Sequence, residues 1–182
     1  MARPVLMGLG VRQRGFTLVE ILVAVAIIGV LVGLAVVAFG KQTRKARGSE
    51  AQAMFAALRV AQEQYHLENG TYLSTGGSEA ATHPTTPTKT SQSFLPLPTT
   101  WTSLRVRLPN ETGYCGYVAI AGLANDATGI GTIAQSFGLT AAPATDWYYL
   151  IAHCDLDGNS TRDSYYFTWS GDTTVKKLDE GY

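Results

Sequence analysis

The sequence predicts an α+β protein in which one long N-terminal helix packs on an antiparallel β-sheet of about four strands. A run of about twenty apolar residues leads into an amphipathic stretch with helical period. The C-terminal part holds short aromatic and apolar segments separated by turn residues. The chain has 182 residues, a length that fits one domain with an appendage.

Charge and cysteine content exclude several classes of protein. The chain carries 14 Lys+Arg and 14 Asp+Glu, and charged residues make up only 15% of it. General nucleic-acid binding needs a basic excess, and global disorder needs high net charge with low hydrophobicity. Two cysteines exclude a disulfide-dense scaffold and a cysteine-only zinc site. The sequence contains no phosphate-binding loop, metalloprotease motif or nucleophile elbow, so we predict no enzyme.

The N-terminal region predicts a basic leader followed by a membrane-spanning helix. Residues 1–15 contain three arginines and no acid. Residues 21–40 contain no charged or strongly polar side chain, and twenty helical residues span about 30 Å, the thickness of a bilayer core. We therefore assign residues 16–40 to a transmembrane half of the helix. The four basic residues that follow at 41–47 slightly oppose a cytoplasmic leader by the positive-inside rule.

The junction between leader and span reads Arg14-Gly15-Phe16-Thr17-Leu18-Val19-Glu20. A carboxylate at the edge of a membrane helix is costly and is therefore usually functional. The alternative is an acid that favours the positive end of the helix dipole.

With this junction and Ala26-Ile27-Ile28-Gly29, the chain resembles the type IV pilin and pseudopilin superfamily over Arg12 to about Tyr72. The resemblance implies that a prepilin peptidase cleaves between Gly15 and Phe16 on the cytoplasmic side and N-methylates Phe16. It also implies that Glu20 of an incoming subunit pairs with the Phe16 amine of its neighbour in a filament.

The resemblance implies a structural subunit of a type IV pilus, serving adhesion, twitching motility or DNA uptake. Major pilins usually have proline at the position of Val37, so this chain is more similar to a minor pilin. Expected partners are other pilin subunits, the prepilin peptidase, an inner-membrane assembly platform and, before assembly, the membrane. The expected location is the inner membrane with a periplasmic head, then an extracellular pilus or periplasmic pseudopilus. The alternatives are a type II secretion pseudopilin and a membrane-anchored binding module that never polymerises.

Residues 41–70 predict the amphipathic half of the helix. One face recurs at steps of three and four residues, and Asn69-Gly70 predicts its C-terminal stop. Gly48 is a candidate bend. The face consists of Arg47, Ala51, Met54, Leu58, Ala61 and Tyr65, and the residues expected largely on other faces are Gln52, Arg59, Gln62, Glu63 and His66.

Residues 71–103 are rich in Ser, Thr and Pro, which predicts a surface connection between helix and sheet. It is either a variable loop or a contact and O-glycosylation surface. Residues 104–182 form the predicted β-sheet head. Its candidate strands are 104–108, 114–121, 147–154 and 164–169, with a Gly-, Ala- and Thr-rich excursion at 122–146.

Cys115 and Cys154 lie on two different predicted strands. In a periplasmic or extracellular head we expect them to form one disulfide. The wide spacing excludes a C-x-x-C redox motif. His153 beside Cys154 does not indicate a Cys-His pair, because adjacent strand residues point to opposite faces.

The acidic segment after the third candidate strand is the one ligand-like cluster. Asp155, Asp157, Asn159 and Asp163 offer oxygen atoms that could bind Ca²⁺. The EF-hand pattern needs glycine at the sixth position, whereas here it is at the fourth. The alternative, which the sequence favours, is a polar hairpin turn. Apart from this calcium candidate, no cofactor or catalytic residue is expected.

Overall fold

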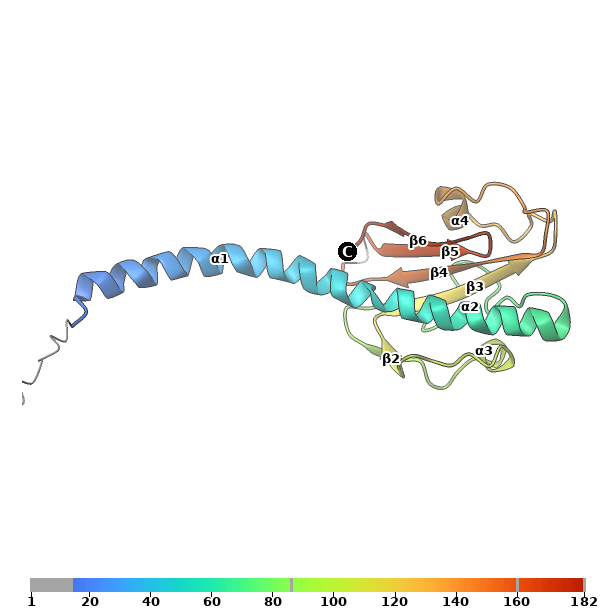
Figure 1. Ribbon diagram of the computed structural model, residues 1–182, viewed down its shortest axis with the longest axis horizontal. Coiled ribbons are helices and arrows are strands. Elements are labelled where there is room, and N and C mark those ends of the chain that lie inside the picture. The colour runs from blue at the N-terminus through green and yellow to red at the C-terminus, as the bar shows by residue number, and fades with distance from the viewer. Residues whose placement is uncertain (1–14, 86, 160, 182) are drawn as a thin grey trace, which may run out of the picture. The chain divides into compact units, whose positions relative to one another are not determined.

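The structure is a computed structural model that describes residues 15–85, 87–159 and 161–181. The leader residues 1–14, including the predicted n-region arginines, lie outside the described residues. The chain divides into two compact units, residues 1–39 and 40–182, which are described separately. The elements are α1 (Leu18–Gly48), α2 (Glu50–Asn69), β1 (Gln92–Ser93), α3 (Thr99–Ser103), β2 (Thr112–Gly113), β3 (Cys115–Gly122), α4 (Thr132–Ser136), β4 (Trp147–Cys154), β5 (Ser164–Trp169) and β6 (Asp172–Leu178) (Figure 1).

The predicted α+β class is confirmed, because the second unit packs α2 on an antiparallel four-stranded sheet. The strand order is β3-β4-β5-β6, so each strand pairs with its neighbour in sequence. The segment after α2 covers the outer edge of β3. There the N–H of Thr75 donates to the Ala119 carbonyl at 2.8 Å, and His83 and Tyr117 exchange two backbone hydrogen bonds. A covered edge cannot template pairing with another chain, which leaves β6 as the other edge.

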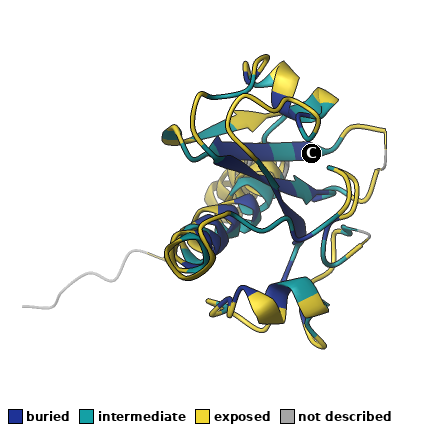
Figure 2. Ribbon diagram, turned by 90° about the vertical axis from the view of Figure 1, so that its right-hand side faces the viewer, coloured by how far each residue is buried: buried dark blue, intermediate teal, exposed yellow. Residues whose placement is uncertain are grey.

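The sheet is buried on both faces, and this explains why β3 and β4 are almost continuously apolar. On one face α2 lies against the buried strands (Figure 2). The core on this face includes Tyr117, Leu150 and Tyr166. On the other face Ile130, Ala134 and Leu139, from the excursion between β3 and β4, form a second core with the sheet. Its strand members are Val118, Ile120, Trp147, Tyr149, Ile151 and Phe167.

The predicted strand at 104–108 is wrong, and a strand at the C-terminus was missed. Trp101 lies in α3, and the chain then turns through Leu104 and Arg105, the latter with a φ of 53°. Leu104 and Val106 are buried as their alternation predicts, but an irregular turn buries them instead of a strand. The fourth strand of the sheet is β6, which follows the short turn at Ser170-Gly171.

The connection at 71–103 is more than a surface loop. Phe94 and Trp101 are 1% exposed and belong to the main core, and Thr75 and Thr82 are buried against β3. The Ser, Thr and Pro content of this connection correctly predicts that it has no long helix or strand. Its two aromatic side chains, however, are large and apolar and are therefore buried in the core.

The amphipathic face of α2 is confirmed for Ala51, Met54, Leu58 and Ala61, all of which are buried. The helix ends at Asn69, and Gly70 takes the left-handed conformation with φ of 78°, as predicted.

Three polar residues expected largely on other faces of this helix face the head instead. Gln62 is fully buried, and its amide both donates to and accepts from the backbone of Leu73. Glu63 accepts from the hydroxyl of Tyr148 at 3.1 Å, and Arg59 donates to Thr168. Buried polar groups need such partners, so the helix face in contact with the sheet is wider than its apolar stripe.

Candidate assembly segment

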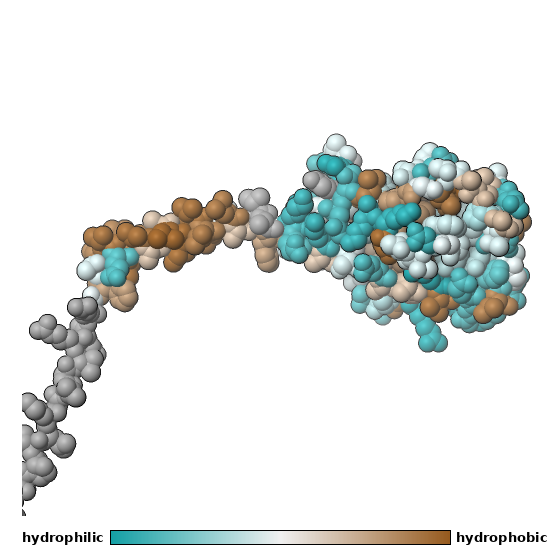
Figure 3. Space-filling model, turned by 45° about the horizontal axis from the view of Figure 1, so that its top comes forward, coloured by the Kyte–Doolittle hydropathy of each residue, from teal (hydrophilic) through white to brown (hydrophobic). Residues whose placement is uncertain are grey.

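The described part of the first unit is an apolar helical segment with no internal core. All its described side chains up to residue 35 are exposed, including the Val, Ile and Leu residues around Gly29 and Gly33. A Cβ added at either glycine would meet no neighbouring atom within 4 Å. The helix is long and apolar enough to cross a membrane (Figure 3, brown). Exposed hydrophobic surface of this extent requires a lipid or protein environment.

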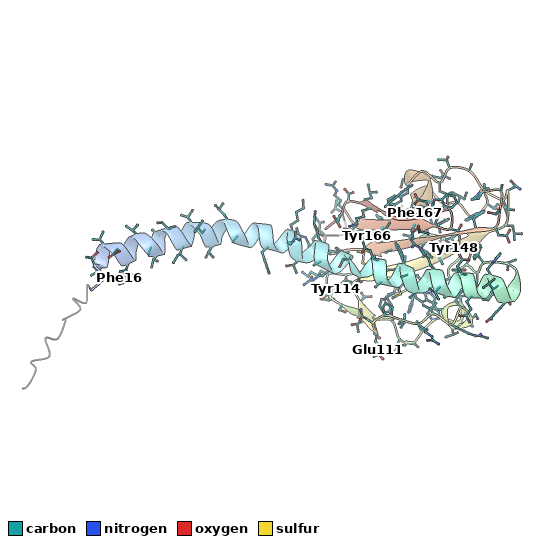
Figure 4. The ribbon with its side chains drawn as sticks, in the orientation of Figure 1. Phe16, Glu111, Tyr114, Tyr148, Tyr166 and Phe167 are labelled. Carbon is teal, nitrogen blue, oxygen red and sulfur yellow. A yellow bond between two sulfur atoms is a disulfide. The ribbon has the colours of Figure 1, made fainter. Side chains whose placement is uncertain are left out.

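Helix α1 begins at Leu18, two residues after Phe16, which is the first residue beyond the predicted cleavage site. Thr17 precedes α1, and its Oγ1 accepts a hydrogen bond from the N–H of Glu20 at 3.2 Å. The sequence Thr-x-x-Glu is that of a capping box, in which the acid stands at the third helical position. Phe16, labelled in Figure 4, lies just outside the helix and is 77% exposed. Gly15 and Phe16 therefore lie outside the regular helix.

Glu20 is placed one helical turn from Phe16, as the spacing predicts, and its side chain is exposed. The pairing of Glu20 with a Phe16 amine of a neighbouring subunit stays a prediction, as do cleavage and methylation. Sequence reasoning missed the contribution of Thr17, although the Thr-x-x-Glu spacing was the available signal.

The predicted disulfide is present between Cys115 and Cys154. The two residues lie directly opposite each other in the β3–β4 register, with Cα atoms 4.3 Å apart. Both are buried in the main core, so the bond links the beginning of β3 to the end of β4. Such a bond across a sequence separation of 39 residues stabilises a fold by about 3–4 kcal/mol in the chain-entropy model.

The acidic segment forms the connection from β4 to β5, as the hairpin interpretation predicts. Asp155 Oδ1 accepts from the N–H groups of Gly158 and Asn159, and Asp157 Oδ1 also accepts from Asn159. Asp163 Oδ2 lies 2.6 Å from Nε2 of His153.

Within the described residues no group of three or more His, Cys, Asp or Glu side chains is arranged to hold a metal ion. The segment is thus a hydrogen-bonded turn as it stands. Calcium binding there stays a prediction.

The junction between α1 and α2 contains two constraints that the sequence did not indicate. A Cβ at Gly48 would overlap the hydroxyl of Tyr166 and lie 2.8 Å from its Cζ. Glu50 Oε1 accepts from the backbone N–H groups of Tyr114 and Cys115, at 2.6 and 2.9 Å, and from the hydroxyl of Tyr117. Burial raises the pKa of the Glu50 carboxyl above 4.5, although these hydrogen bonds oppose the shift. Gly48 is therefore required by packing, beside any role as a bend.

An exposed apolar helix followed by a second helix packed on an antiparallel four-stranded sheet is an arrangement consistent with the type IV pilin fold. Residues 11–36 match the family described as the prokaryotic N-terminal methylation motif. The N-terminal segment of this chain is thus similar to the segment that this family describes.

Three curated proteins illustrate the similarity. The chain is 41% identical over 61 residues to the type IV major pilin protein PilA of Myxococcus xanthus, covering 34% of this chain and 28% of that protein. It is 42% identical over 66 residues to the type II secretion system core protein G of Pectobacterium carotovorum, covering 36% and 42%. It is 35% identical over 66 residues to a fimbrial protein of Neisseria meningitidis, covering 36% and 39%.

The matched region spans between 28% and 42% of the length of these relatives. No solved structure matches the chain significantly. The relatives are by name pilus and secretion-system proteins, and none is named as an enzyme.

Proposed function

We propose that this chain is a structural subunit of a type IV pilus, and a minor pilin in preference to a major one. The observation that carries the proposal is the junction Gly15-Phe16-Thr17-Leu18-Val19-Glu20 at the start of an exposed apolar helix. Cleavage after Gly15 would create an α-amine with a pKa near 8, which is largely cationic at neutral pH. In hydrocarbon an unpaired charge is strongly disfavoured, so a Glu20 carboxylate and this amine would select one docking register.

Processing is tested by intact-mass measurement of chain purified from the producing cell. Gly15 has no side chain, so a peptidase can approach its backbone closely. Gly15→Val should leave the leader attached, whereas the wild-type chain should lose residues 1–15 and gain the mass of a methyl group. Unchanged cleavage of Gly15→Val would contradict this junction.

Assembly is tested with Glu20 variants in sheared filaments. Glu20→Ala should insert into the membrane, because the segment becomes more apolar, but should fail to enter filaments. Glu20→Gln keeps a side chain that can complete the capping box at Thr17 and loses only the charge, so it separates docking electrostatics from helix capping. Glu111→Ala, which removes an exposed carboxylate from the head, is the matched control. Wild-type incorporation of Glu20→Ala would exclude the charge-pairing mechanism.

The second candidate is a pseudopilin of a type II secretion system. The 42% identity to a core protein of such a system favours it as much as the 41% identity to a major pilin favours a pilus. Deletion of the gene separates the two, because a pseudopilin is required for protein export and a pilin for an extracellular filament. A chain that enters neither structure would support the third alternative, a membrane-anchored binding module.

A further inference from the structure

A group of basic side chains lies at the beginning of the second unit. We define the basic collar as Lys41, Arg44, Lys45, Arg47 and Lys89. The first four follow the apolar run directly within α1, whereas Lys89 comes from the connection between α2 and β1. The fold brings Lys89 to the others, because Nη1 of Arg47 donates to its carbonyl oxygen at 3.2 Å. The sequence alone separates this fifth cation from the cluster by more than forty positions.

The collar borders a cleft in the second unit whose lining carries more positive than negative side chains. The cleft is lined by Gly40, Thr43, Arg44, Arg47, Lys89, Thr90, Leu156 and Asp157. Arg44 donates to the carbonyl of Gly181 at 2.8 Å, a contact that leaves its charge uncompensated. Lys45 lies 3.6 Å from Glu180, which partly neutralises its charge. The cleft lining contains one carboxylate, that of Asp157, and three cationic side chains, those of Arg44, Arg47 and Lys89.

The depth of the collar follows from helix geometry. Lys41 comes immediately after the apolar run, and Arg47 lies six residues further, about 9 Å along the helix at 1.5 Å per residue. The polar headgroup layer on each side of a bilayer core is about 5–8 Å thick. In a chain whose apolar run spans the core, α1 therefore carries these side chains through the headgroup layer.

We propose that the basic collar binds the phosphate groups of anionic phospholipids in the leaflet on the side of the head. The proposal rests on the membrane span of the proposed function and not on filament assembly. Each cation near an anionic surface contributes about fivefold to binding. The contacts would hold the head at the membrane surface until the subunit leaves the bilayer.

The proposal is tested by the lipid preference of the full chain in neutral detergent micelles. Phosphatidylglycerol and phosphatidylcholine are titrated separately, and the bound lipid is counted by native mass spectrometry. The wild-type chain should prefer phosphatidylglycerol, and the preference should weaken in high salt. The double variant with Arg47→Gln and Lys89→Gln should lose about 25-fold in affinity for phosphatidylglycerol. The matched control, Arg105→Gln with Arg107→Gln, removes two exposed arginines elsewhere in the second unit and should bind like wild type.

Equal affinity for the two lipids, or an equal loss in the control, would overturn the proposal. So would full competition by an equal concentration of inorganic phosphate, since the ligand would then be a free anion. The single variant Lys89→Gln controls for misfolding, because among the described residues the Lys89 ammonium makes no hydrogen bond or ion pair. This variant should lose about fivefold in affinity for phosphatidylglycerol. Insertion into phosphatidylcholine vesicles is measured as a separate assay. A chain that inserts there but shows no lipid preference in micelles refutes only the collar, whereas a chain that does not insert refutes the proposed function as well.

Discussion

Replacing Gly48 by alanine should destabilise the head, although the same change in an open helix stabilises it. A helical Gly→Ala substitution normally gains about 1 kcal/mol. At Gly48, however, the new methyl group would overlap the hydroxyl of Tyr166 and approach Cζ to 2.8 Å. Tyr166 is 1% exposed on β5 and belongs to the main core. Overpacking of a core costs about 1–3 kcal/mol, and overlap with a buried ring places this site at about 2–3 kcal/mol. Subtracting the helical gain leaves an expected net loss of about 1–2 kcal/mol.

A second substitution identifies the clashing atom. The Tyr166 hydroxyl is buried and has no hydrogen-bond partner among the described residues. Tyr166→Phe alone should therefore change stability little, since it removes a buried group that makes no bond. In the Gly48→Ala background it should restore part of the loss, because the nearest overlapping atom is gone and only the ring remains close.

Urea unfolding of the full chain in detergent micelles, followed by the near-ultraviolet dichroism of the aromatic core, measures these effects. Gly40→Ala is the matched control, because a Cβ there meets only the Arg44 guanidinium at 3.9 Å. It should be neutral or slightly stabilising. If Gly48→Ala is as stable as wild type, or if Tyr166→Phe does not rescue it, packing against Tyr166 is not the reason for glycine at this position.

Three further predictions concern the second unit. Burial raises the pKa of the Glu50 carboxyl in the folded state. The contribution of its neutral form to the free energy of unfolding is therefore complete below the unfolded-state pKa and is lost as pH rises through the folded-state pKa. Glu50→Gln should remove this pH dependence from the free energy of unfolding, measured with urea across pH. Replacing Cys115 and Cys154 together by alanine should lower the free energy of unfolding by about 3–4 kcal/mol, and alkylation of the native chain before reduction should label neither cysteine. A fragment of residues 40–182 should be soluble and show the same thermal transition as the head of the full chain, whereas an aggregated product would place the domain boundary elsewhere.

The elements with long or regular patterns were predictable from the sequence. The apolar run, the four-residue recurrence in α2 and the Asn69-Gly70 stop each depend on neighbours in the chain, and each was confirmed. Strands β3, β4 and β5 were predicted within a residue or so, because aromatic and apolar runs of strand length are distinctive.

The errors in predicted secondary structure occur at segments whose conformation depends on packing against residues distant in the sequence. Leu104 and Val106 were expected to be buried, and they are, but alternation over three apolar residues does not distinguish a strand from a turn that packs on a core. Strand β6 has three intermediate and four exposed residues among seven, so it lacks the apolar pattern of its neighbours. Its Asp172–Leu178 register is set by the short turn after β5 and by hydrogen bonds to that strand.

Glu50 shows why a site of this kind is invisible in sequence. It reads as an ordinary first-turn acid of α2, and the helix dipole alone accounts for a carboxylate there. Its partners, Tyr114 and Cys115, are more than sixty residues away, and they use backbone N–H groups, which carry no side-chain signature. The carboxylate accepts hydrogen bonds from two backbone N–H groups at the beginning of β3, next to the disulfide. Glu50 thus connects α2 to the beginning of β3, and only the folded chain brings these groups within hydrogen-bond distance.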